Sequence, residues 1–149
     1  MDYDVVEAPP ATYAVIHGTV PREQVADTIR SSIEEVARWA QPDAVAGPPL
    51  TISAMTPAGE LDLHVGWQVR DDAEEPPQPI ELVHAPATRA AVHVHVGPYD
   101  ALPNVYQELW DALSADGLAP ADSPRELYES DPRVTDPQQA VTRIIWPLG

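Results

Sequence analysis

An internal repeat constrains the fold of this chain more than any other feature of its sequence. Residues 10–17, PATYAVIH, align with residues 86–93, PATRAAVH, and each segment is followed by a stretch whose apolar residues recur at helical spacing. The segments PLTIS at 49–53 and PRELY at 124–128 also align. Each half therefore reads strand, strand, helix, strand, strand.

The boundary between the halves is an acidic, Pro-rich linker over residues 70–79, RDDAEEPPQP. The strand pattern that ends at Trp67, before the linker, aligns with the C-terminal pattern that ends at Trp146. We therefore predict a single domain over residues 1–149, made of pseudo-repeats 1–70 and 79–149.

Neither half is expected to fold alone, because roughly seventy residues with one helix bury little apolar surface. We predict that the halves join about a pseudo-twofold axis as a duplicated α+β fold. Its mostly antiparallel eight-stranded sheet would carry two helices on one face. The other face would form a ligand groove where the halves meet, the kind of concavity in which small molecules bind.

The first half shows alternating segments on both sides of a helical one. Residues 4–7 and 12–18 read as strands separated by Pro9-Pro10, and the simplest interpretation is a hairpin. A helix is predicted over 21–40, where apolar residues recur at helical spacing. The half ends with predicted strands over 50–55 and 61–67.

In the second half, residues 92–96 alternate three valines with His93 and His95. Alternate side chains of a strand point to opposite faces, so one face is apolar and the other carries imidazoles. A helix over 102–113 presents an apolar stripe, and we expect this stripe to cover the valine face. Asp100 is the predicted N-cap, while Pro103 suits the first turn and Gly117 the C-terminal stop.

The strand at 125–128 is expected to bring further polar groups to the histidine face. If Leu127 faces the helix, Glu126 and Tyr128 must face away from it. His93, His95, Glu126 and Tyr128 would then share one open face of the sheet. Trp67, Trp110 and Trp146 lie on apolar stripes and are expected in the core.

Composition excludes several classes of function. The net charge is −16 and the chain has no lysine, which disfavours binding to a nucleic-acid backbone or an anionic membrane. No cysteine is present, so disulfides, thiol nucleophiles and thiolate metal sites are excluded. The N-terminus lacks a signal-peptide pattern and no apolar run approaches a membrane span, so we expect a soluble cytoplasmic protein.

Several of these segments together resemble the gyrase-inhibitor-like small-molecule-binding domain, over essentially the whole chain. The segments are HVGPY at 95–99 before the helix, ELY at 126–128, Asp131-Pro132, LDLHVG at 61–66 and the C-terminal stretch from Val141 to Leu148. The resemblance implies a duplicated α+β fold with a hydrophobic, aromatic-lined groove. It further implies lipophilic, often cationic, ligands anchored by the glutamate of the Glu-x-Tyr strand, which is Glu126 here.

Two departures from the family pattern bear on ligand charge. Arg143 stands where an acidic residue is frequent, and His64 stands where many members have glutamate. Both changes remove negative charge from the groove, and Arg143 could pair with Glu126 and hold it ionised. On the expected groove face, the repeat alignment matches His17 with His93, Thr51 with Glu126, and His64 with Arg143.

We therefore predict a stand-alone binding domain that senses or sequesters a lipophilic drug or toxin. No helix-turn-helix segment precedes the first strand, so the chain itself is not expected to be a transcription factor. Its ligand site would comprise Glu126, Tyr128, His93, His95, His17, His64, Arg143 and Thr51.

Two other classes of function remain open. Some family members hydrolyse strained, cyclopropane-containing genotoxins, and here Glu126 would act as general base with Tyr128 or a histidine as acid. Alternatively, the acidic surface could bind a DNA-handling enzyme. His93-x-His95 is a weak half of a metal site that His17, His64 and Glu126 could complete; we predict no metal and no cofactor.

Overall fold

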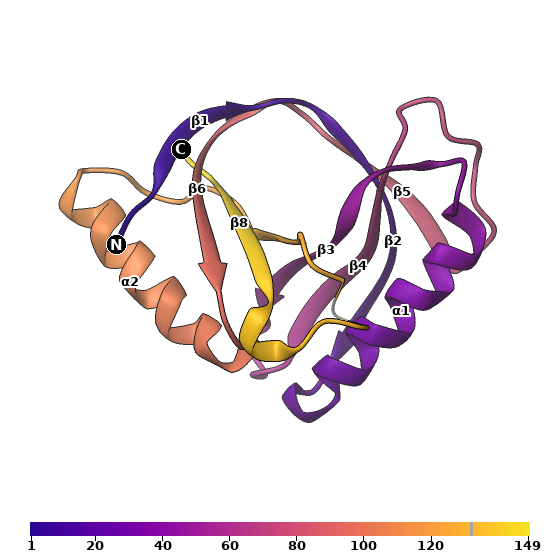
Figure 1. Cartoon of the computed structure of the whole chain (residues 1–149). Coiled ribbons are helices and arrows are strands. Elements are labelled where there is room, and N and C mark those ends of the chain that lie inside the picture. Colours follow the sequence, from indigo (N-terminus) through magenta and orange to yellow (C-terminus); the bar gives the residue numbers. More distant parts are fainter. Residues whose placement is uncertain (132) are drawn as a thin grey trace. The chain divides into compact units, whose positions relative to one another are not determined.

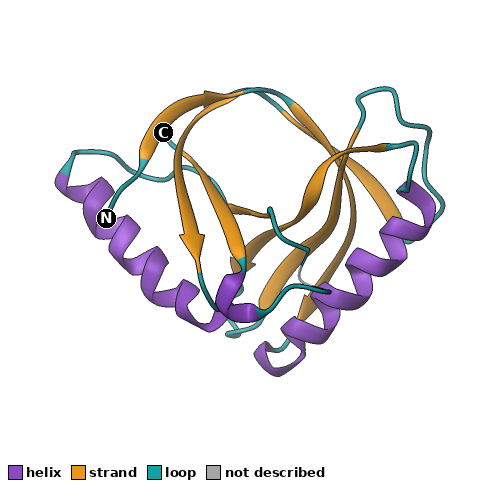
Figure 2. Ribbon diagram, viewed as in Figure 1, coloured by secondary structure: helices purple, strands orange, loops and turns teal. Residues whose placement is uncertain are grey.

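The computed structural model describes residues 1–131 and 133–149; Pro132, one of the residues that carry the family resemblance, lies outside them. The elements are β1 (Asp4–Ala8), β2 (Ala11–Val20), α1 (Val25–Ala40), β3 (Val45–Met55), β4 (Leu61–Val69), β5 (Ile80–Ala85), β6 (Thr88–Val96), α2 (Leu102–Ala115), β7 (Arg125–Tyr128) and β8 (Val141–Pro147), with short 3-10 turns Arg22–Gln24, Tyr99–Ala101 and Pro137–Gln139. The described residues contain eight strands and two helices, and the fold is the predicted mostly antiparallel α+β type (Figures 1 and 2).

The chain divides into two compact units. Unit 1 contains residues 1–9 and 87–149, and unit 2 contains residues 10–86. In unit 1 the strands run in the order β1-β6-β8-β7 and α2 supplies the helix, whereas unit 2 has the order β5-β2-β4-β3 and the helix α1. The strand pairings within each unit are antiparallel.

The predicted hairpin between the first two strands is wrong. β1 pairs with β6, Val6 lying opposite Ala90, whereas β2 pairs with β5 and β4. A tight two-residue hairpin turn needs a positive φ at one or both central residues. Proline is restricted to a φ near −65°, so Pro9-Pro10 cannot supply such a turn.

The apolar stripe of α2 does not cover the valine face of β6, contrary to the prediction. Val94 is 45% exposed and Val96 65% exposed, while Ala91 on the opposite face is fully buried. Ala91 belongs to the cluster beneath α2, and His93 lies opposite Ile144 of the same cluster. The full set of buried members is Ala91, Leu102, Leu109, Leu113, Ile144 and Leu148. The two histidines of β6 therefore share the face of the sheet that α2 covers.

Unit 2 packs α1 on β4 through a tryptophan. Trp67 is 6% exposed, and its indole N–H donates a 2.9 Å hydrogen bond to the carbonyl oxygen of Ile33 in α1. Ile33, Val36 and Val65 are buried in this layer. A buried indole needs such a partner, so the bond fixes the helix against its strand.

The tryptophans differ in exposure, and one of them is not a core residue. Trp110 on α2 is 46% exposed, although its ring packs on Trp146 with centroids 5.9 Å apart. Trp146 is partly buried and donates to the carbonyl oxygen of Asp122. The prediction of a core position is therefore wrong for Trp110, which lies at the edge of the helical stripe.

Both predicted helices are present, but the predicted N-cap of α2 is wrong. Asp100 lies in the 3-10 turn before α2 and does not cap it, because the N-cap position is Ala101. Pro103 occupies the first turn, and Gly117 follows α2 with a φ of +75°. Within residues 1–131 and 133–149, neither helix combines the length and apolar character that a membrane span requires.

Strand registers correct one pair in the repeat alignment. His17 lies opposite His64 in unit 2, and Val94 lies opposite Arg143 in unit 1. If His64 corresponds to Arg143, then His17 corresponds to Val94, and the match of His17 with His93 is wrong by one residue. A slip of one residue places a side chain on the other face of its sheet.

The close packing of β2 on β4 gives a test of the fold. A Cβ at Gly66 would lie 1.8 Å from the carbonyl oxygen of Ala14, whereas a Cβ at Gly18 on β2 meets nothing within 4 Å. We expect Gly66→Ala to lower the free energy of unfolding by about 3 kcal/mol or more, because backbone atoms must move to relieve the overlap. Urea denaturation measures this loss, with Gly18→Ala as the matched control. Equal stabilities of the two variants would contradict the described packing.

Candidate functional site

The most unusual group in the molecule is the carboxylate of Glu126 on β7. Glu126 lies opposite Ile144 of β8, and Ile144 is in the buried cluster beneath α2. Its side chain consequently points toward α2, not away from it as predicted. The strand is short and its neighbours Arg125, Leu127 and Tyr128 are buried, so the carboxylate is held among protein atoms.

Two tyrosines donate hydrogen bonds to this carboxylate from different elements. The hydroxyl of Tyr106, on α2, donates to Oε2 of Glu126 at 2.7 Å. The hydroxyl of Tyr128, two residues along β7, donates to Oε1 at 3.1 Å. Each carboxylate oxygen has further lone pairs, so a third partner can still be accepted.

The surroundings of Glu126 include two buried hydroxyls that have no partner among the described residues. They are the hydroxyls of Tyr99 and Thr142. Thr142 on β8 lies opposite Tyr128, and the Tyr99 ring packs edge-on against the Tyr128 ring with centroids 5.7 Å apart. Buried polar groups in proteins are nearly always hydrogen-bonded. These two hydroxyls therefore retain hydrogen-bonding capacity close to Tyr128.

His95 completes the group. On β6 it lies opposite Thr142, and its Nε2 is 3.1 Å from the carbonyl oxygen of Pro98. We call the whole set the tyrosine–carboxylate site. Its members are Tyr99, Tyr106, Glu126, Tyr128, Thr142 and His95.

Burial governs the electrostatics of this site. It raises the pKa of Glu126 above the ordinary value of 4.5, against the opposing effect of the bonds from Tyr106 and Tyr128 and of nearby His95. Burial and the Glu126 carboxylate also raise the pKa of the Tyr106 hydroxyl, which stays a donor. A buried carboxylate without a cationic side chain bonded to it is poised either to hold a proton or to accept a positive charge.

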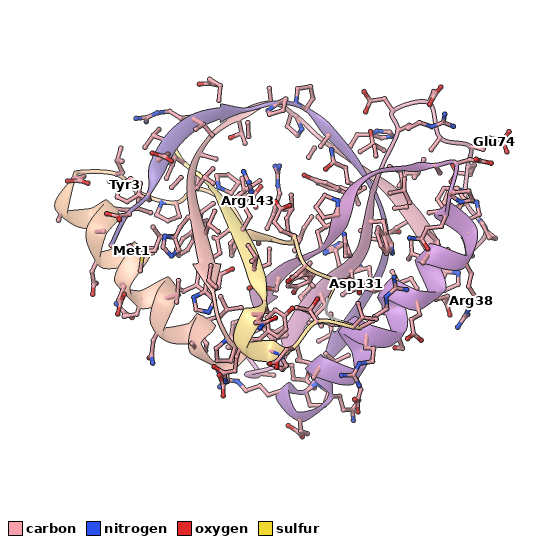
Figure 3. The ribbon with its side chains drawn as sticks, viewed as in Figure 1. Met1, Tyr3, Arg38, Glu74, Asp131 and Arg143 are labelled. Carbon is pink, nitrogen blue, oxygen red and sulfur yellow. The ribbon has the colours of Figure 1, made fainter. Side chains whose placement is uncertain are left out.

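The arginine that was expected to pair with Glu126 does not do so. Arg143 donates from Nε to Oε1 of Glu129 at 2.8 Å, and it lies opposite Val94, on the exposed valine face of β6. Figure 3 shows Arg143 on the side of β8 that faces away from α2. The positive charge of Arg143 therefore does not neutralise Glu126.

The other predicted site residues are divided between the units. His93 reaches the N-terminal segment, with Nδ1 2.6 Å from the carbonyl oxygen of Asp2. His17, His64 and Thr51 belong to unit 2, where Thr51 is 2% exposed. Of the eight residues predicted, Glu126, Tyr128 and His95 come together in one site.

Sequence reasoning missed Tyr106, Tyr99 and Thr142. Tyr106 was counted only as a member of the apolar stripe of the helix, although a tyrosine on a buried stripe needs a partner for its hydroxyl. That requirement is the signal that could have found the bond to Glu126. Tyr99 and Thr142 carry no comparable signal in the sequence.

Comparison with known proteins gives a family and several structural relatives. The family model for the GyrI-like small molecule binding domain matches residues 1–148. The C-terminal domain of EcmrR is similar, with a TM-score of 0.81 and 21% identity over 99% of this chain and 97% of that one. EcmrR in a complex with DNA is also similar, with a TM-score of 0.82 and 22% identity. The match covers 99% of this chain but only 57% of that one.

Two further similar structures are a complex with a small molecule and a hydrolase. SAV2435 bound to tetraphenylphosphonium has a TM-score of 0.73 and 14% identity over 100% of this chain and 94% of that one. A hydrolase from Listeria innocua has a TM-score of 0.69 and 14% identity over 99% and 92%. At these identities the likenesses show a shared fold. No curated protein matches this chain in sequence.

The raised pKa of Glu126 predicts a pH dependence of stability. Between about pH 4.5 and the folded pKa, the native chain holds a proton that the unfolded chain has lost. The free energy of unfolding from this group therefore falls as pH rises through that window, by up to about 1.4 kcal/mol per pH unit. Glu126→Gln should remove this slope, so that the free energy of unfolding of the variant rises relative to that of the wild type as pH increases.

Urea denaturation at a series of pH values measures the effect. Glu129→Gln is the control, because Glu129 is a more exposed carboxylate paired with Arg143. Parallel stability profiles for the wild type and Glu126→Gln across that window would contradict the raised pKa.

Proposed function

Because this chain belongs to the GyrI-like small-molecule-binding domain family, we propose that its tyrosine–carboxylate site binds lipophilic, cationic small molecules, with Glu126 as the anchor. The observation that carries the proposal is a carboxylate held against α2 by two tyrosine hydroxyls, with no cationic side chain hydrogen-bonded to it among residues 1–131 and 133–149. A bound cation would supply the missing charge. Sensing or sequestering a toxic compound follows from such occupancy.

The aromatic rings support the preference for a cation. Tyr99, Tyr106 and Tyr128 bring three ring systems to one carboxylate, and the faces of such rings attract positive charge within about 6 Å. Apolar parts of a ligand would replace protein contacts in the same place, while the unpartnered hydroxyls of Tyr99 and Thr142 offer hydrogen bonds. The departure at Arg143 does not argue against cations, since Arg143 pairs with Glu129.

The charge of the ligand can be tested directly. Tetraphenylphosphonium and the neutral triphenylphosphine oxide, which also carries phenyl groups, are titrated into the full chain by calorimetry. We expect tetraphenylphosphonium to bind more tightly, and Glu126→Gln to weaken its binding at least about tenfold, roughly 1.4 kcal/mol. Binding of the neutral compound should change little.

The matched control is Glu129→Gln, which removes a carboxylate that pairs with Arg143 and lies outside the tyrosine–carboxylate site. It should leave both affinities unchanged. Equal weakening of tetraphenylphosphonium binding by the two variants would show that the effect is one of net charge, and would contradict an anchoring role for Glu126.

A second candidate function is hydrolysis of a strained electrophile. The observation that favours it is the raised pKa of the Glu126 carboxyl, because a carboxylate of higher pKa is a stronger general base toward water. Tyr128 would then donate its proton to the leaving atom. Both roles use the same site, so binding alone does not separate them.

Turnover separates the two functions. Cyclopropane-bearing electrophiles are incubated with the wild type and with Glu126→Gln, and products heavier by one water are sought by mass spectrometry. Hydrolysis predicts a product whose rate falls at least about a hundredfold in the variant. If the wild type binds the compounds and yields no product, the chain is a binding domain for them.

A further inference from the structure

Unit 2 carries its own cluster of imidazole and carboxylate groups. His17 on β2 lies opposite His64 on β4, and Val15, two residues before His17, lies opposite Glu81 on β5. Opposed residues of antiparallel strands, and residues two apart on one strand, project from the same face. His17, His64 and Glu81 therefore share one face of this sheet.

That face is the one that α1 leaves uncovered. Trp67 is three residues from His64 on β4, so its side chain projects from the other face, where its indole N–H bonds to Ile33 of α1. His17 and Glu81 are exposed and His64 is partly buried. A small ion can reach all three side chains from solvent.

The three side chains converge within the range of one ion. The rings of His17 and His64 stack with centroids 4.0 Å apart and planes 4° from parallel. One nitrogen of each ring and one carboxylate oxygen of Glu81 lie within 4.8 Å of one another. Zinc binds such atoms at about 2.0–2.2 Å, so modest side-chain rotation brings all three into coordination.

A second carboxylate supports one of the two imidazoles. The carboxylate of Asp62 is 2.5 Å from Nε2 of His17, and a carboxylate on one ring nitrogen is the usual partner of a histidine that binds metal through the other.

We propose that His17, His64 and Glu81 form a binding site for a divalent transition metal ion, for which Zn²⁺ is the best fit. Two imidazoles and a carboxylate are ligands that Zn²⁺ accepts, and three protein ligands leave one position open for water or a bound molecule. His93 and His95, the pair that the sequence pattern suggested, contact backbone carbonyls of unit 1 instead.

Calorimetry with ZnCl₂ on the full chain tests this site. We expect one bound ion per chain, and a loss of affinity of at least about tenfold in both His17→Gln and His64→Gln. His84→Gln is the matched control, because His84 also lies on β5 but contacts Thr12, on the opposite face. This control and Glu126→Gln should bind Zn²⁺ as the wild type does, which makes the result independent of the tyrosine–carboxylate site.

A second measurement guards against misfolded variants. Thermal denaturation in EDTA compares the metal-free proteins, and added Zn²⁺ should raise the melting temperature of the wild type and His84→Gln but not of His17→Gln or His64→Gln. The proposal is overturned if Zn²⁺ neither binds nor stabilises the wild type. It is equally overturned if folded His17→Gln and His64→Gln retain wild-type affinity.

Discussion

The interaction on which the functional part of this molecule depends is the bond between Tyr106 of α2 and Glu126 of β7. A carboxylate that faces a helix-covered apolar cluster is unfavourable unless its oxygens are satisfied. Tyr106 and Tyr128 satisfy them while leaving the negative charge without a counter-ion bonded to it in the described part of the chain. The same bonds therefore hold α2 against the sheet and satisfy the carboxylate, and a molecule that binds Glu126 would lie beside them.

The sequence predicts the elements of this fold well and the faces of its strands poorly. Both long helices, Val25–Ala40 and Leu102–Ala115, lie where apolar residues recur at helical spacing, and the Glu-x-Tyr motif of the sequence already indicates Glu126 and Tyr128. Alternation shows which residues share a face, but it does not show which face a helix covers. Hydrophobicity alone predicts that the valines of β6 lie in the core, yet Val94 and Val96 are exposed, because apolar residues are common on protein surfaces.

That single error in β6 explains most of what was missed at the site. If the valine face packs on α2, the histidines and Glu126 must lie on the open face, far from Tyr106. The alanines do not distinguish the two faces, because Ala91 in the helix cluster and Ala90 on the valine face are both fully buried. The two pseudo-repeats also diverge at this point. In unit 2 the strand position that matches Glu126 is held by Thr51, a buried neutral residue, so the repeat preserves the scaffold and only unit 1 carries a carboxylate there, one that is partly buried.

The pairing of β1 with β6, and not with its neighbour β2, has a consequence for folding during synthesis. β1 is at the N-terminus but pairs with β6, so that Asp4 lies opposite Val92, and the last strand of unit 1 ends at Pro147. During synthesis the whole of unit 2, residues 10–86, is made between β1 and its partner β6. Such non-local pairing slows folding. The sheet of the unit that holds the tyrosine–carboxylate site can therefore be completed only after residue 147 has been synthesised.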